Sequence, residues 1–266
     1  MSAAIKLSSP ATREFWEIPV LFEDEHLLAL DKPSGLLSSP DRYDPTRPNL
    51  MRLLHEGIKL GKPWARERGI TYLANAHRLD FETSGVMLLA KSKPVLIALA
   101  DQFGMNQPAK SYLALAQRTP IEASFSVDAP LSPNPFQAGV VRVNPRQGKN
   151  SRTDFEVVEK FDGYAWVKCR PLTGRTHQIR VHLRHAGHPI VADAIYGGKP
   201  LWLSRLKVEY RLKPGREERP LLNRVALHAA ELTVTHPVTG AAVNIQSPLP
   251  KDLVVALKYL RKYAAA

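Results

Sequence analysis

Short apolar runs separated by turn residues dominate the first part of the chain. Residues 20–24 and 26–32 have the pattern of two strands in a hairpin. The next turn contains Pro33, which fixes φ, and Gly35, which tolerates the left-handed region. The alternation therefore predicts a β-hairpin followed by a tight turn.

Further along, the apolar period switches between that of helices and that of strands. Thr176 is a candidate cap for one helix and Gly187 is a candidate stop. The pattern predicts helices over 44–61, 93–106, 176–187 and 250–263, and strands over 85–92, 110–117, 152–172 (a hairpin about Asp162-Gly163) and 226–248. No regular β-α-β rhythm is present, which favours an α+β fold with a mostly antiparallel sheet.

The chain shows no internal repeat and no low-complexity linker. We expect residues 1–17 to form a loose, polar leader and residues 18–266 to form a single domain. Residues 199–224 are basic and punctuated by proline, which is typical of an insertion. We expect this segment to be a flexible loop that touches a partner.

Composition narrows the class of partner. The net charge is +12, from 37 basic and 25 acidic residues among 266. A surplus of this size favours a nucleic-acid partner. Since the basic residues are spread through the chain, a membrane-binding patch is not indicated. The one cysteine, Cys169, lies in a strand-like run and excludes an intramolecular disulfide. With no apolar run of signal-peptide or membrane-spanning length, we expect a cytoplasmic protein.

Three stretches contain candidate chemistry: HRLDFETSG, KSYLALA and GRTHQIRVHL. In the first, Asp80 stands between Arg78 and a turn, just ahead of the buried strand. A surface ion pair is the ordinary interpretation, and an anionic nucleophile is the alternative. If Asp80 approached Arg180, its ionised form would be favoured. Tyr112 is either a packing residue or a flat face for a base.

The histidines invite a metal hypothesis. They are His177, His182, His185 and His188. Their spacing is not H-E-x-x-H, and no cysteine or carboxylate completes a ligand set. We therefore predict no metal site, and the residues alone indicate a basic α+β protein that faces nucleic acid.

The motifs together resemble those of the RluA-type pseudouridine synthases. HRLDFETSG, DKPSGLLSSP, KSYLALA, GRTHQIRVHL and LHA at 227–229 follow one another in the order of that family, over roughly residues 18–250. The resemblance implies a mixed, mostly antiparallel sheet with flanking helices and an active-site cleft across the sheet. It also implies an RNA isomerase that converts specific uridines of rRNA or tRNA to pseudouridine. That reaction conserves every atom, so no cofactor is expected.

The resemblance also implies roles for individual residues. Asp80 matches the aspartate that attacks the uridine after the base has flipped out of its stack. Tyr112 matches the tyrosine that stacks on the uracil, and Arg180 matches the arginine that pairs with the aspartate. Arg78 matches the residue that fills the gap left by the flipped nucleotide. The residues expected to bind substrate are His77, Arg78, Arg175, His177, Gln178 and, as an apolar contact under the base, Leu227.

Two departures from the family pattern bear on the choice of RNA. Only about seventeen residues precede the first family strand, so we expect no N-terminal S4-type RNA-binding domain. Ala192 also stands where relatives more often have glycine, and the GLLSSP loop lacks a histidine that many of them carry. We expect a monomer that binds structured RNA, with selection by the catalytic domain itself.

Three rival functions are weaker. A binding protein without chemistry would gain nothing from a carboxylate facing RNA, because such a charge repels phosphate. A zinc-dependent base deaminase needs H-x-E and P-C-x-x-C motifs, which one cysteine cannot supply. A DNA-binding regulator that used 176–187 as its recognition helix would leave the long β-rich remainder without a role.

Overall fold

The computed structural model describes residues 4–41, 44–212 and 215–266. These fall into two compact units, and the expected single domain over 18–266 stays a prediction. Unit 1 comprises Met1–Lys110 and Ala229–Pro248, and unit 2 comprises Ser111–His228 and Leu249–Ala266.

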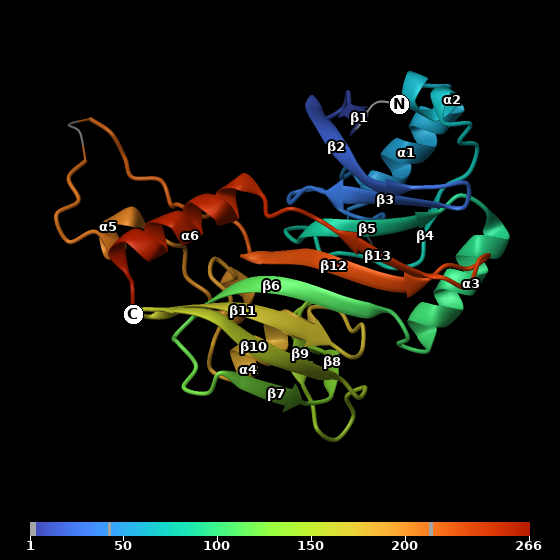
Figure 1. Ribbon diagram of the computed structural model, residues 1–266. Helices are drawn as coiled ribbons and strands as arrows, with labels where there is room; N and C mark the ends of the chain where they lie inside the picture. Colours follow the sequence, from blue (N-terminus) through green and yellow to red (C-terminus); the bar gives the residue numbers. More distant parts are fainter. Residues whose placement is uncertain (1–3, 42–43, 213–214) are drawn as a thin grey trace. The chain divides into compact units, whose positions relative to one another are not determined.

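Unit 1 is a sheet with three helices. Its strand order is β1-β2-β3-β5-β12, with β4 beside β5 and β13 beside β12 (Figure 1). The register between β2 and β3, between β3 and β5, and between β12 and β13 is antiparallel. The bounds are β1 Ala4–Ser9, β2 Glu14–Glu23, β3 Leu27–Lys32, α1 Leu50–Lys59, α2 Pro63–Glu67, β4 Ala74–Asn75, β5 Ser84–Ala90, α3 Lys93–Gly104, β12 Leu227–Thr235 and β13 Ala242–Gln246.

Residues 4–17 do not form the loose leader that we expected for 1–17, and residues 1–3 lie outside the described residues. Strand β1 pairs antiparallel with the first half of β2, so that Leu7 lies opposite Trp16. Ile5, Leu7 and Ile18 are buried, whereas Lys6 and Ser8 are exposed. The alternation of apolar and polar side chains over these few residues is enough to cover one face of a hairpin.

Unit 2 is a second antiparallel arrangement in the strand order β6-β11-β10-β7. A small hairpin of β8 and β9 stands beside it. The bounds are β6 Ala109–Gln117, β7 Ser124–Asp128, β8 Leu131–Pro133, β9 Val141–Val143, β10 Arg152–Phe161, β11 Tyr164–Pro171, α4 Gln178–His185, the 3-10 helix η1 Ala194–Tyr196, α5 Leu203–Leu206 and α6 Lys251–Tyr263.

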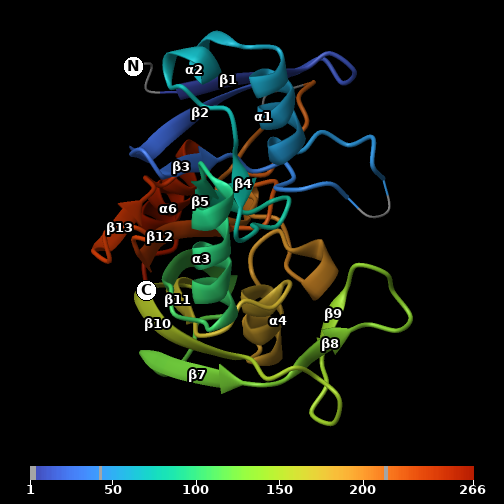
Figure 2. The same cartoon turned by 90° about the vertical axis from the view of Figure 1, so that its right-hand side faces the viewer.

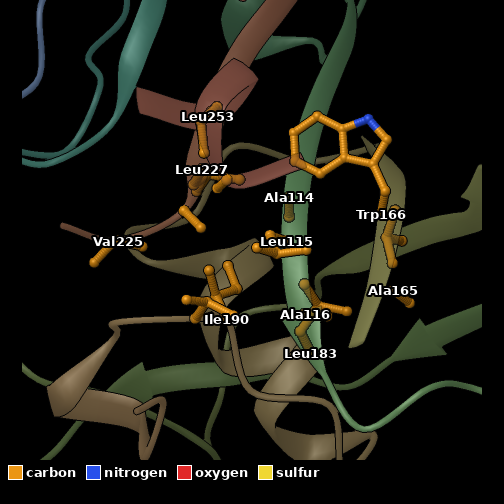
Figure 3. Packing of buried hydrophobic residues seen from close by; sticks show 14 of the residues in the cluster. Ala114, Leu115, Ala116, Ala165, Trp166, Leu183, Ile190, Val225, Leu227 and Leu253 are labelled. Atoms are coloured by element: carbon orange, nitrogen blue, oxygen red, sulfur yellow. The ribbon is translucent and has the colours of Figure 1, made fainter. Parts of the chain in front are cut away.

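The core of unit 2 joins segments that lie far apart in the sequence. Leu115 on β6 and Trp166 on β11 pack with Leu183 of α4 and Leu253 of α6 (Figure 3). Cys169 is fully buried in the same core, as its position in a strand-like run predicts. Burial of this apolar surface is the main term that stabilises the unit.

The periodic elements predicted from the sequence are confirmed. All seven residues of β5 are buried, and α3 lies against this strand (Figure 2). Val95 and Leu99 of α3 belong to the same buried cluster as Val86 and Leu88 of β5. The hairpin about Asp162-Gly163 forms between β10 and β11, with Gly163 at a φ of 72°. Together with the antiparallel pairings and the few helices, these elements confirm the α+β class.

Two details of the expected elements differ. Helix α4 begins at Gln178, and its N-cap is His177 in the left-handed region, so Thr176 is not the cap. The segment 199–224 contains α5 and is closed at its base by a bridge between Leu201 and Leu222, with Leu221 N–H donating to the Leu201 carbonyl at 2.7 Å. Over its described residues it is therefore a loop with a short helix at its start, and whether it touches a partner stays a prediction.

Candidate active site

Asp80 lies in unit 1 on the connection from β4 to β5. The buried side chain of Ser38 makes two hydrogen bonds to the backbone of Leu79, the residue before Asp80. Its hydroxyl donates to the Leu79 carbonyl at 2.8 Å and accepts from the Leu79 N–H at 3.0 Å. Because Leu79 is itself buried, the backbone at Asp80 has little freedom to move.

A second set of bonds fixes the other side of Asp80. Gly35 N–H donates to the Phe81 carbonyl at 2.9 Å, and Thr83 N–H donates to the Asp80 carbonyl at 3.1 Å. Gly35 has a φ of 79°, as the turn chemistry of this stretch predicts. The ammonium of the buried Lys32 donates to the carbonyls of Pro33 and Leu36, both at 2.8 Å, and so stiffens the supporting turn.

The side chains along this connection face different ways. Asp80 is half-buried and Arg78 is exposed, whereas Leu79 between them points into the core. An exposed arginine beside a half-buried carboxylate suits contact with an RNA strand. The structure thus leaves Arg78 accessible, as its expected role requires.

His77 is held by internal contacts. Its Nε2 accepts the Leu88 N–H at 2.9 Å, and its ring stacks on Phe103 with centroids 4.8 Å apart. Burial, together with the nearby charge of Lys110, lowers the pKa of His77 to about 4. Burial also lowers the pKa of Lys110 to about 8. A neutral ring bonded to β5 makes His77 a support for the Asp80 connection.

Arg180 lies in unit 2, on the buried face of α4. Its Nε and Nη2 donate to the two carboxylate oxygens of Asp193 at 2.7 and 2.9 Å. The side chains of this pair are only 5% and 0% exposed. A bidentate, buried pair fixes the plane of the guanidinium.

The ring of Tyr196 adds a third constraint. It lies 5.0 Å from the Arg180 guanidinium carbon, and its hydroxyl accepts the Val141 N–H at 3.0 Å. The same hydroxyl is hydrogen-bonded to His177 Nδ1 at 2.8 Å. The half-buried His177 is therefore tied to the group that holds Arg180.

Gln178 is occupied by internal bonds. Its side-chain oxygen accepts from the Thr173 hydroxyl at 2.7 Å and from the Arg175 N–H at 3.0 Å. Its nitrogen donates to the Arg152 carbonyl and to the Thr153 hydroxyl, both at 3.0 Å. An amide has two acceptor and two donor positions, and all four are used. This disfavours the expected substrate contact and makes Gln178 an anchor of the loop before α4.

The remaining predicted residues, Arg175, Tyr112 and Leu227, differ in exposure. Arg175 is exposed and donates to the Asn150 carbonyl at 3.3 Å. Tyr112 is half-buried on β6, opposite Cys169 of β11. Leu227 is only 3% exposed and packs in the core (Figure 3). The expected apolar contact under a base is thus not supported for Leu227, because its side chain is already covered by protein.

Sequence reasoning did not single out Asp193, Tyr196 or Ser38. A signal existed for Asp193, because it is the one carboxylate in the apolar stretch PIVADAIYGG, and a buried carboxylate needs a cationic partner. Ala192 before it has a φ of 61°, a conformation that glycine adopts more easily. For Ser38, whose partner lies 41 positions away, no local signal exists.

The expected pairing of Asp80 with Arg180 joins residues of unit 1 and unit 2, and it remains a prediction. No group of three or more metal-binding side chains occurs in residues 4–41, 44–212 and 215–266. No helix among those residues has the length and apolarity needed to cross a membrane.

Comparisons with known proteins agree on the family. The family model described as RNA pseudouridylate synthase matches residues 26–185. Ribosomal large subunit pseudouridine synthase C of Escherichia coli (strain K12) is 39% identical over 244 residues, which cover 91% of this chain and 70% of that protein.

Two solved structures share the fold. Human RNA Pseudouridylate Synthase Domain Containing 4 superposes with a TM-score of 0.68 at 24% identity, over 91% of this chain and 92% of that chain. Human RNA Pseudouridylate Synthase Domain Containing 1 superposes with a TM-score of 0.63 at 26% identity, over 88% of this chain and 84% of that chain. The chain therefore belongs to the RluA-type RNA pseudouridine synthases, which are isomerases.

Proposed function

We propose that this enzyme converts uridine to pseudouridine in structured RNA, with Asp80 as the nucleophile and with the target base flipped out of its stack. Large-subunit rRNA is the first substrate class to test, because the relative from Escherichia coli is named for it. A tRNA target is the alternative.

The observation that carries this proposal is the rigid support of Asp80. Its neighbours Leu79 and Phe81 are bonded to the turn after β3, and His77 is bonded to β5. Attack by a carboxylate requires that it be held in a defined position before substrate arrives. A surface carboxylate in an ordinary turn would not need supports from two separate segments.

The reaction balances without a co-reactant. The carboxylate attacks the uridine at C1′ or C6, and the bond between C1′ and N1 breaks. The base rotates, a new bond joins C1′ to C5, and the bond between the Asp80 carboxylate and the nucleoside breaks, which regenerates the free carboxylate. The C5 proton leaves and N1 gains a proton, so every heavy atom is conserved. We propose that Tyr112 stacks on the uracil and assists the loss of the C5 proton.

The remaining residues divide into contacts and supports. Arg78 and Arg175 are exposed, and we propose that they contact RNA. Arg180 is proposed to pair with Asp80, held in its plane by Asp193 and Tyr196. His77 and Gln178 act as positioning residues, and His177 acts through its bond to Tyr196. A cytoplasmic monomer that needs no cofactor or metal completes the proposal.

The test is release of tritium from RNA labelled at uridine C5, on separate rRNA and tRNA pools. Asp80→Asn is expected to lower kcat by roughly a thousandfold or more while RNA affinity stays within about tenfold. Asp101→Asn, which changes an exposed carboxylate on α3, is the matched control and should retain full activity. An active Asp80→Asn enzyme would refute the nucleophile assignment.

A further inference from the structure

Cationic side chains gather around two tyrosines at the C-terminal end of α6 in unit 2. The rings of Tyr259 and Tyr263 are stacked, with centroids 6.1 Å apart and planes at 16°. The ammonium of Lys262 lies 5.2 Å from the Tyr263 ring centre, and that of Lys207 lies 6.0 Å from it. Lys207 directly follows α5, which contacts α6 (Figure 1). Two helices therefore bring two cations to one aromatic ring.

Further cations extend this group. Lys258 is exposed one helical turn before Lys262 on α6. Arg205 on α5 is exposed and close to Tyr164: burial raises the pKa of that tyrosine, and the charge of Arg205 opposes the rise. We call this group the α5–α6 cationic surface, formed by Arg205, Lys207, Lys258, Lys262, Tyr259 and Tyr263.

Two carboxylates of this region are paired with arginines outside the surface, and a third, Glu218, accepts the Ser204 N–H of α5 at 2.9 Å. Glu159 is bound by Arg261, and Asp252 is bound by Arg224. Within the parts of the chain that the structure describes, the four cations of the surface form no ion pair with a carboxylate. A local excess of positive charge of this kind attracts a polyanion.

We propose that the α5–α6 cationic surface binds the phosphodiester backbone of a single-stranded segment of the substrate RNA. The proposal rests on the proposed function in that the ligand is RNA. Cation–π contact holds the ammonium groups of Lys207 and Lys262 at 6.0 and 5.2 Å from the Tyr263 ring centre, where both are prepared to meet RNA phosphates. Ammonium groups act as point charges without base preference, so this contact adds affinity and not sequence selection.

Salt dependence of binding tests this surface. The probe is a fluorescent oligouridylate of about 12 nucleotides, long enough for one binding site of this kind. The triple variant Lys207→Ala, Lys258→Ala, Lys262→Ala should reduce the slope of log K against log salt by about 2, since each lost phosphate contact on a single strand contributes about 0.7. At about 0.1 M salt each contact then accounts for roughly a fivefold change in Kd.

The matched control removes the same charge from unit 1. The triple variant Lys6→Ala, Lys59→Ala, Lys62→Ala changes three exposed lysines there, and it should leave the slope near that of the wild type. Tyr263→Leu removes the aromatic face and should weaken binding in part, whereas Tyr263→Phe keeps the face and should bind as the wild type does.

Equal slopes for the two triple variants would overturn the proposal, as would a preference of the surface for duplex RNA of the same length. The binding assay involves no turnover. The wild type could release no tritium while the α5–α6 triple variant still showed the reduced salt slope. That result would refute the proposed reaction and support the proposal that this surface binds RNA.

Discussion

The neutral state of His77 gives a quantitative prediction about pH. Its Nε2 accepts the Leu88 N–H, so a proton on that nitrogen would turn an acceptor into a donor and break the bond. Burial and the charge of Lys110 lower the pKa of His77 from 6.5 to about 4. Below pH 6.5 the unfolded chain therefore binds more protons than the folded protein, and stability falls as the pH falls from 6.5 toward 4.

The size follows from the linkage. Each pH unit within this window lowers the free energy of unfolding by up to about 1.4 kcal/mol. Between pH 7 and pH 5 the loss attributable to His77 is at most about 2 kcal/mol.

Two measurements check this prediction. NMR of protein carrying ¹³C-labelled histidine should show a ring that stays neutral well below pH 6 and whose signal is missing in His77→Gln. Urea unfolding at pH 7 and pH 5 should show that the wild type loses up to about 2 kcal/mol more than His77→Gln. The exposed His185→Gln is the control. A His77 signal that titrates near 6.5, or parallel losses in the wild type and His77→Gln, would refute the reasoning.

Two substitutions test the supports of the site. Asp193→Asn removes one charge from the buried pair with Arg180 and should lower the unfolding free energy by about 3–5 kcal/mol. The control, Asp154→Asn, lies in the exposed pair with Arg152 and should change the unfolding free energy by less than about 1 kcal/mol. Equal shifts of Tm in the two variants would contradict the role of burial. Gly85→Ala puts a Cβ 2.2 Å from the Ala229 carbonyl oxygen at a φ of 116°, so we expect a loss of more than about 3 kcal/mol and of activity. The control, Gly104→Ala, adds its Cβ in open space at the end of α3 and should leave the unfolding free energy unchanged or slightly raised. A stable, active Gly85→Ala protein would contradict this expectation and show that β5 can move.

Strongly periodic elements and local motifs were readable from the sequence. Strand β5 is a continuous apolar run, and α3 repeats its apolar residues at helical spacing, so each is determined by residues close together in the chain. The family followed from HRLDFETSG and GRTHQIRVHL, because motif order depends only on sequence. The short alternation in residues 4–9 was overlooked, although it was enough to form β1.

Tertiary structure alone decided what each polar side chain binds. Ser38 supports Leu79 from 41 positions away, and Arg180 meets Asp193 only because the chain turns after α4. Gln178 and Leu227 belong to the family motifs, yet the fold uses the first as an anchor and buries the second in the core. The physical reason is that burial and hydrogen bonding depend on segments distant in sequence, whereas helix and strand periodicity depends on near neighbours.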